Sequence, residues 1–273
     1  MSEAAKSNRV RRMRLKYAGS CAVCQREVAA GESAAWHRTN KAVICLGCLD
    51  PAKTMVVESM PGASLDREYK RRKQAREGRV YSKFPRVGGA LLALSGDPAS
   101  TKAFKTGAEG ERAIAARLEK LCVGEVLFLH NRCRGTSARS GDIDHIAVAP
   151  SGVFVIDAKK YADARVRVRR TGGLFSPGKE QLLVSGRDRT KLLDSIDKQF
   201  LAVSDALEGR TVQVTAMLCF LGADFPLMES LRVRGVPIVG PRGADKLLRR
   251  KGPLDAASRQ QIWEHLARSL PPA

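Results

Sequence analysis

Asp144, Asp157 and Lys159 stand within or beside two apolar runs between residues 141 and 160, where the chain reads GDIDHIAVAPSGVFVIDAKK. Both runs are rich in β-branched residues and a Pro-Ser-Gly turn separates them, so they predict a β-hairpin. In that hairpin Asp144 lies opposite Ala158 to within one residue, and Asp157 and Lys159 project from one face of their strand. Two carboxylates and an ammonium would then converge, an arrangement suited to holding Mg²⁺ and activating a water beside a phosphodiester.

An Asp-x-Lys pair at the end of a strand is often no more than a solvated ion pair, and this alternative applies here. The surrounding residues argue against it, because Asp144 and Asp157 stand within runs that are otherwise almost entirely apolar. Burying charge without a task is costly, and strongly perturbed ionisable groups gather at functional sites. We therefore interpret the hairpin as a candidate catalytic site.

Two helices are expected to contribute further polar groups to this patch. Residues 106–121 open with a capping box and follow helical spacing, which places Glu111 on the same apolar face as Ile114. A carboxylate in the first turn of a helix also favours the helix dipole, so its position alone decides nothing. Residues 187–208 predict a second amphipathic helix with Gln199 facing inward, where an amide needs a partner: a buried carbonyl, or a water or phosphate beside the carboxylates.

Taken in order, these motifs resemble those of the nuclease-related domain (NERD) family, which is grouped with the restriction-endonuclease-like superfamily of Glu…Asp…(Asp/Glu)-x-Lys nucleases. The resemblance runs from about residue 106 to about residue 240 and rests on GAEGE at 107–111, GDIDHI at 141–146, GVFVIDAK at 152–159 and Gln199. It implies a restriction-endonuclease-like α/β fold, in which helices flank a mixed sheet. Asp157 departs from the common pattern, since many members of the family carry Glu there.

The resemblance also implies roles for individual residues. Glu111, Asp144 and Asp157 would be ligands of a catalytic Mg²⁺ or Mn²⁺. Lys159 would position or deprotonate the attacking water, or stabilise the charge that develops on the phosphate. Gln199 would be the auxiliary polar residue of the following helix. The shorter aspartate side chain at position 157 would place the metal differently from a glutamate.

Four cysteines predict a second metal site, of a structural kind. Cys21, Cys24, Cys45 and Cys48 form two CxxC pairs with twenty residues between them, a spacing typical of a Cys₄ zinc site. Disulfides are the competing explanation, and they are disfavoured because we find no signal peptide and expect an intracellular setting. A thioredoxin-like site would need one CxxC at a strand–helix junction. His37 is a further candidate ligand, but four cysteines already complete the tetrahedron.

The chain is strongly basic: 48 Lys and Arg residues against 28 Asp and Glu residues leave a formal net charge of +20 at pH 7. Such a charge favours a polyanionic partner, with nucleic acid as the default. Basic stretches occur at 9–16, 66–79 and 165–170, and although such runs are usually solvated surfaces, we expect these to track phosphates. The contacts that we expect come from two of them: Lys70, Arg71, Arg72, Arg165, Arg167 and Arg169. Aromatic residues make up only 5%, which gives little support for recognition of single strands by base stacking.

Composition divides the chain into four parts. We expect a disordered basic arm over 1–16, a Cys₄ zinc-ribbon-like module over 17–50, a linker with a basic helix over 51–105, and the nuclease-related domain with a C-terminal helical extension over 106–273. The elements predicted in that domain are helix 106–121, strands 125–130, 142–149 and 153–159, a basic meander 164–184, helix 188–208, strands 212–221 and 236–239, and a helix near 255–269.

We expect a Mg²⁺-dependent deoxyribonuclease with structural Zn²⁺, acting on DNA in a bacterial cytoplasm, where it would be nucleoid-associated. Two alternatives use the same features without catalysis: a nucleic-acid-binding protein, and an adaptor whose zinc module recruits a protein partner. Membrane association is disfavoured, because no apolar run is long enough to span a bilayer and no basic stretch carries a strong opposing aromatic face.

Overall fold

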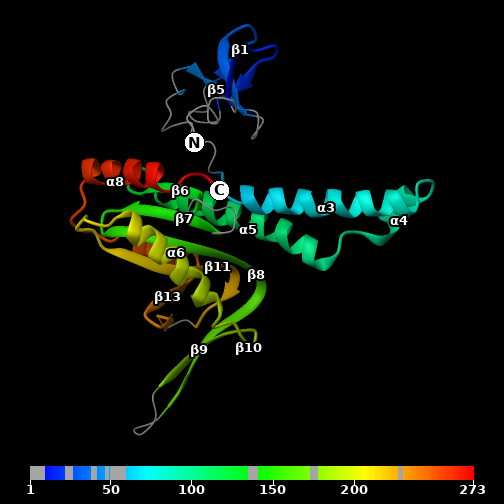
Figure 1. Ribbon diagram of the computed structural model, residues 1–273. Helices are drawn as coiled ribbons and strands as arrows, with labels where there is room; N and C mark the ends of the chain where they lie inside the picture. Colours follow the sequence, from blue (N-terminus) through cyan, green and yellow to red (C-terminus); the bar gives the residue numbers. More distant parts are fainter. Residues whose placement is uncertain are drawn as a thin grey trace.

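The computed structural model describes three parts of the chain: a small N-terminal sheet, a helical hairpin and an α/β domain (Figure 1). The described residues are 10–21, 27–37, 42–46, 49, 60–134, 141–172, 178–226 and 230–273. No helix within these ranges has both the length and the apolar character needed to cross a membrane.

The α/β domain is built on a mixed sheet, which contains eight strands in the described ranges. Its first three strands form an antiparallel meander of β6 (Leu127–Cys133), β7 (Asp142–Ala149) and β8 (Gly152–Thr171). β8 pairs in parallel with β11 (Val214–Asp224), which pairs in parallel with β13 (Val236–Val239). Shorter or outlying strands complete the sheet: β9 (Lys179–Val184), β10 (Arg187–Asp188) and β12 (Arg232–Val233).

The predicted hairpin is present as β7 and β8. Ala149 pairs with Gly152 across the turn, and the pairing continues as far as His145 with Ile156. Gly152 has a φ of 141°, and a Cβ added there would lie 2.5 Å from the carbonyl oxygen of Gln213. Only glycine therefore fits where β8 begins beside the chain that leads into β11.

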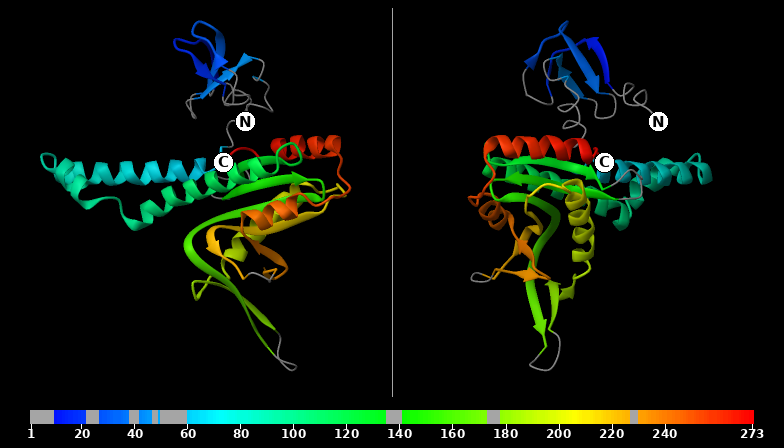
Figure 2. Two further views of the ribbon diagram at one scale, coloured as in Figure 1. Left: turned by 180° about the vertical axis from the view of Figure 1, so that it is seen from behind. Right: turned by 60° about the vertical axis from the view of Figure 1, so that its left-hand side comes forward.

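β8 is much longer than the strand predicted over 153–159. Its first part is buried in the sheet, and its second part continues outward as a ribbon with β9 (Figure 2). Along this ribbon Val166 is buried, whereas its neighbours Arg165 and Arg167 are exposed. The basic meander predicted over 164–184 is thus a regular hairpin, because its alternate apolar residues join the main hydrophobic core.

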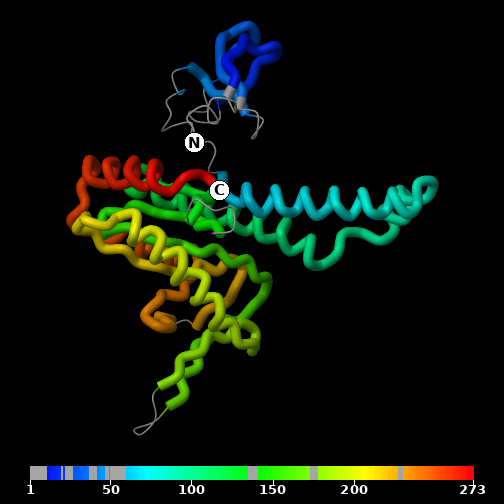
Figure 3. Tube along the Cα trace, viewed as in Figure 1, coloured from blue at the N-terminus to red at the C-terminus, as the bar shows by residue number. Residues whose placement is uncertain are grey.

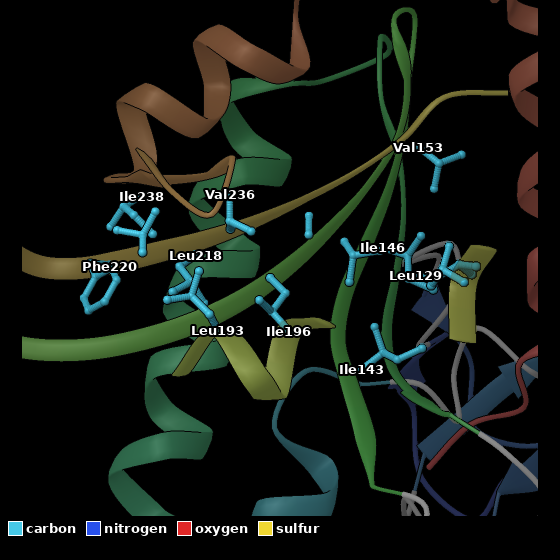
Figure 4. Packing of buried hydrophobic residues seen from close by; sticks show 14 of the residues in the cluster. Leu129, Ile143, Ile146, Val153, Leu193, Ile196, Leu218, Phe220, Val236 and Ile238 are labelled. Atoms are coloured by element: carbon cyan, nitrogen blue, oxygen red, sulfur yellow. The ribbon is translucent and has the colours of Figure 1, made fainter. Parts of the chain in front are cut away.

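Helices cover both faces of the sheet, as the predicted α/β class requires. α5 (Ala99–Leu121) and α7 (Pro241–Leu248) pack on one face, in a cluster that includes Ile114, Leu118, Met217, Ala244 and Leu248. α6 (Leu192–Ala206) and α8 (Ala256–Ser269) belong to the larger cluster of Figure 4, which includes Ile146, Leu193, Ile196 and Leu218. α6 begins later than predicted, because the first residues of the expected helix form β10.

A helical hairpin of α3 (Ala63–Lys83), α4 (Gly88–Ser95) and the first half of α5 projects from the sheet (Figures 1 and 2). α5 begins at Ala99 rather than at the predicted Thr106. The expected capping box is not a helix end, because the residues before it are helical and pack against α3. One such contact places the Arg72 guanidinium 4.3 Å from the centre of the Phe104 ring.

The C-terminal residues run beside β6 and reach the start of α3 (Figure 3). The backbone N–H of Cys133 donates to the carbonyl oxygen of Pro271 at 2.8 Å, and the N–H of Ala273 donates to that of Asn131 at 2.9 Å. Arg67 of α3 donates to the carbonyl oxygen of Ala273. The helical hairpin is therefore tied to the sheet at its base.

The N-terminal part contains a three-stranded sheet of β1 (Val10–Arg14), β4 (Ser33–His37) and β5 (Ala42–Cys45), and a two-stranded sheet of β2 (Gly19–Ser20) and β3 (Glu27–Val28). The prediction of a disordered arm over 1–16 is wrong for Val10–Arg14, which pair with β4 as strand β1, while residues 1–9 lie outside the described residues. Cys21 and Cys45 are buried, and the backbone N–H of Cys45 donates to Cys21 Sγ at 3.3 Å. Cys24 and Cys48 lie outside the described residues.

Candidate active site

The two aspartates of the hairpin meet where the continuous buried run of β8 ends. Asp157 closes that run and is only 1% exposed. Because His145 pairs with Ile156, the register brings Asp144 opposite Asp157, within the one-residue tolerance of the prediction. The backbone N–H of Ala158 donates to Asp144 Oδ2 at 2.9 Å, which fixes the Asp144 carboxylate against β8.

Lys159 lies beside Asp157 and forms an ion pair with its Oδ1 atom. The two side chains share a face of β8, as their spacing predicts. Burial by itself disfavours the charged ammonium, but the carboxylates of Asp157, Asp144 and Glu111 outweigh it and raise the pKa of Lys159. The ammonium is therefore held in its charged form among three acidic groups.

Glu111 and Gln199 approach this patch from helices α5 and α6, and both are buried. Glu111 Oε2 accepts a hydrogen bond of 3.0 Å from the backbone N–H of Gly62, at the start of α3. Gln199 Nε2 donates to Asp157 Oδ2 at 3.2 Å, while Gln199 Oε1 has no partner among the described residues. Since α5 begins at Ala99, Glu111 stands well inside the helix, and a first-turn dipole effect does not explain it.

Burial raises the pKa of each of the three carboxyl groups. Burial, and then the charge of Asp157, raises the pKa of Asp144 to about 7. Burial, and then the charge of Asp144, raises the pKa of Glu111 to about 9. The pKa of Asp157 is also raised by burial, against the opposing effect of Lys159. Carboxyl groups that keep their protons near neutral pH favour a bound cation, which can take the place of those protons.

The donor set suits a hard divalent cation, because carboxylate oxygens are the ligands that Mg²⁺ takes and the unpartnered Gln199 Oε1 is a further acceptor. As the side chains stand, no group of three or more His, Cys, Asp or Glu residues in the described ranges is arranged to hold a metal ion. Hydrogen bonds from Gly62 and Ala158 and the ion pair of Lys159 each engage one carboxylate. Lys159 therefore competes with a cation for Asp157 Oδ1.

Two features of the site were missed from the sequence. One is the Gly62 N–H, a backbone donor brought from 49 residues away, which no side-chain pattern could signal. The other lies beneath Asp144, where His145 Nδ1 is 2.8 Å from His130 Nδ1 and His130 Nε2 is 2.7 Å from Glu119 Oε1. This chain of polar groups, buried at the two histidines and exposed at Glu119, joins β7, β6 and α5. The pairing of His130 with His145 across the two strands was the signal for it.

The arginines predicted to bind nucleic acid differ between the two basic stretches. Arg165, Arg167 and Arg169 are all exposed on one side of the β8 ribbon. In α3, by contrast, Glu68 binds two of the predicted side chains, since Arg71 Nη2 and Arg72 Nε each lie within 2.7 Å of its carboxylate. Hydrogen bonds from these two guanidinium groups lower the pKa of Glu68 to about 2. Lys70 is exposed.

A mixed sheet flanked by helices, with Glu, Asp and Asp-x-Lys side chains gathered on one patch, defines a restriction-endonuclease-like fold. Residues 106–221 match the family model of the nuclease-related domain (NERD). No curated protein and no solved structure matches the chain.

Proposed function

We propose that this protein is a metal-dependent nuclease that hydrolyses phosphodiester bonds of DNA. The observation that carries the proposal is the gathering of Glu111, Asp144, Asp157 and Lys159 on one largely buried patch of a nuclease-related domain. Three carboxyl groups and an ammonium share this patch although burial opposes the charged form of each, and a catalytic task accounts for that cost.

Glu111, Asp144 and Asp157 would hold the Mg²⁺ or Mn²⁺. Such an ion neutralises charge on a phosphate and lowers the pKa of a bound water. The ammonium of Lys159, once released from Asp157, stabilises the negative charge that develops on the phosphate or holds the attacking water beside it. Gln199 keeps the Asp157 carboxylate in place through Nε2, and its free Oε1 is an acceptor for that water.

The basic surface would bring the substrate to this patch. Arg165, Arg167 and Arg169 project from the same strand that carries Asp157, so a backbone held along the ribbon leads to the carboxylates. A net charge of +20 adds a long-range attraction to a polyanion. Both features favour an extended nucleic acid over a small phosphate ester.

The four N-terminal cysteines would hold a structural Zn²⁺. The short contact between the Cys45 N–H and Cys21 Sγ supports this, because it joins one cysteine from each CxxC pair. Metal analysis of the purified protein should find about one zinc per chain. Its absence would reject the Cys₄ site.

Plasmid nicking by the full-length protein tests the nuclease proposal. Wild type is expected to cleave in Mg²⁺ or Mn²⁺ and to be inactive in EDTA, whereas Lys159→Ala should bind DNA and fold normally but leave it uncut. Cleavage of RNA instead of DNA would show that the substrate is RNA. Cleavage by Lys159→Ala at the wild-type rate would remove Lys159 from the mechanism.

A second candidate function is nucleic-acid binding without catalysis. It is favoured by the ion pair of Lys159 with Asp157 and by the engaged state of the three carboxylates. This function predicts affinity for DNA that falls steeply with salt, with no cleavage of DNA or RNA in any divalent cation. An adaptor function predicts instead a protein partner that is lost when Cys45 and Cys48 are replaced by Ser, in a variant that still binds DNA.

A further inference from the structure

A cavity of about 740 Å³ opens beside the sheet, and none of the residues of the carboxylate patch lines it. Its walls come from the end of α5, from the carboxyl ends of β11 and β13, and from α7. Both apolar and cationic side chains line it. The apolar ones include Phe225, Leu231, Ile238 and Leu247.

The charged residues of this lining all carry positive charge. They are Arg117, Arg232, Arg242, Lys246 and Arg250, and the described lining contains no Asp or Glu. None of these five forms an ion pair with another described residue, although Arg232 donates to the carbonyl oxygen of Gly235 at 3.0 Å. Arg249 of the neighbouring turn, which is outside the lining, is paired with Glu125 at 3.2 Å. The described cations that face the cavity thus have no carboxylate partner among the described residues.

The strand register places this cavity near the carboxylate patch. Asp157 of β8 pairs with Leu218 of β11, and Leu218 pairs with Ile238 of β13, which lines the cavity. All three strands are parallel, so their carboxyl ends share one edge of the sheet. Two strand spacings are about 10 Å. At about 3.4 Å per nucleotide along a duplex axis, that is roughly three nucleotides.

We propose that this cavity binds the polynucleotide that is cut at the carboxylate patch, at a phosphate and base about three nucleotides away. The proposal rests on the proposed nuclease function. Arginine and lysine side chains without carboxylate partners suit phosphate oxygens. The Phe225 ring, half-buried in the wall, offers a surface on which a base can stack.

The test compares DNA binding by two double variants that lose the same charge. The α7 variant, Lys246→Ala with Arg250→Ala, removes two exposed cations of the cavity, one in the last turn of α7 and one two residues beyond its end. Lys102→Ala with Arg210→Ala is the control, because both are exposed and outside the lining: Lys102 lies near the start of α5, fifteen residues before Arg117, and Arg210 precedes the amino end of β11. Both are made in the full chain carrying Lys159→Ala, so that binding is measured whether or not the wild type cleaves.

The α7 variant should weaken binding of a labelled oligonucleotide and lower the slope of log K against log salt concentration by about 1.5, the value for two lost phosphate contacts. The control variant should keep the slope of its parent, and both should keep its melting temperature. Equal slopes for the α7 variant and its parent would overturn the proposal. Loss of binding to a mononucleotide with unchanged binding to the oligonucleotide would also overturn it, in favour of a free-nucleotide site. Wild type that fails to cleave contradicts the nuclease function alone, since the binding comparison does not depend on it.

Discussion

The two parts of strand β8 carry charge in opposite ways. In the buried part, Asp157 is 1% exposed and its charge is met by Lys159 and Gln199. In the outer ribbon, Arg165 and Arg167 face solvent while Val166 between them joins the core. Burial strengthens electrostatic interactions and shifts protonation, so the first part is equipped for chemistry. Several exposed arginines together attract a polyanion, in a way that depends on salt concentration, so the second part is equipped to hold one.

The largest effect should follow from removing charge in the buried part. Asp157→Asn keeps an oxygen for the Gln199 amide but loses the negative charge, so cleavage should fall by about 10²- to 10⁴-fold. Binding of DNA should change little. Initial rates of plasmid nicking in Mg²⁺ measure cleavage, and fluorescence anisotropy measures DNA binding.

Asp163→Asn is the matched control for that variant. Asp163 lies on the same strand but is exposed, and its φ of 52° is a conformation that asparagine tolerates. It should cleave like wild type. An equal loss of activity in both variants would mean that general damage to β8, and not the buried charge, is responsible.

Removing the ribbon arginines should have the next largest effect, on binding. Replacing Arg165, Arg167 and Arg169 with Ala should weaken DNA affinity by about 10- to 100-fold and lower the salt slope by roughly 2 to 3, if each contacts one phosphate. Arg170→Ala is the control, because Arg170 is already paired with Glu180 at 3.1 Å. A triple variant with the slope of wild type would show that the ribbon is an ordinary solvated surface.

Burial at the patch should also make the metal-free fold sensitive to pH. Glu111 has a pKa of 4.5 when unperturbed and about 9 in the fold, so between these values the folded state holds a proton that the unfolded state has lost. Stability must therefore fall as the pH rises through this window. Glu111→Gln removes that penalty and should stabilise the metal-free protein by about 1 to 3 kcal/mol near pH 8. Urea unfolding in EDTA at low and high pH would show it, and an unchanged pH dependence would contradict the assignment.

The smallest effect is expected on α3. Arg71→Ala should change DNA affinity by less than about twofold, because Glu68 already holds that guanidinium. Lys70→Ala should lower the salt slope by about 0.9 if the exposed ammonium contacts a phosphate. Identical salt slopes for the two variants would show that pairing within α3 does not decide which cations meet DNA.

The hairpin and its charged residues could be predicted because the information is local. Alternation of apolar residues around one turn sets the register of β7 and β8, and that register fixes where Asp144, Asp157 and Lys159 lie. Glu111 and Gln199 were placed by helical periodicity, since both stand on apolar faces that must pack on the sheet. These signals need no knowledge of distant contacts.

The remaining parts depend on contacts between distant segments. Packing against α3 extends α5 back to Ala99. The helix therefore begins before the capping box at Thr106, where an isolated helix would start. The hydrogen bond from Gly62 to Glu111 arises from the same packing, where an added Cβ at Gly62 would lie 2.7 Å from the carbonyl oxygen of Ala108. The basic cavity joins α5, α7 and two strand ends, and no single stretch of sequence contains its pattern.

The most direct test of the buried patch as a catalytic site compares two adjacent lysines. Lys159 is held among three carboxylates, whereas Lys160 turns to the other side and lies 3.4 Å from Glu109. Wild type and Lys160→Ala should nick plasmid DNA in Mg²⁺ at similar rates, within about threefold, while Lys159→Ala should lose at least about 10²-fold. Equal activity of the two lysine variants would contradict the account.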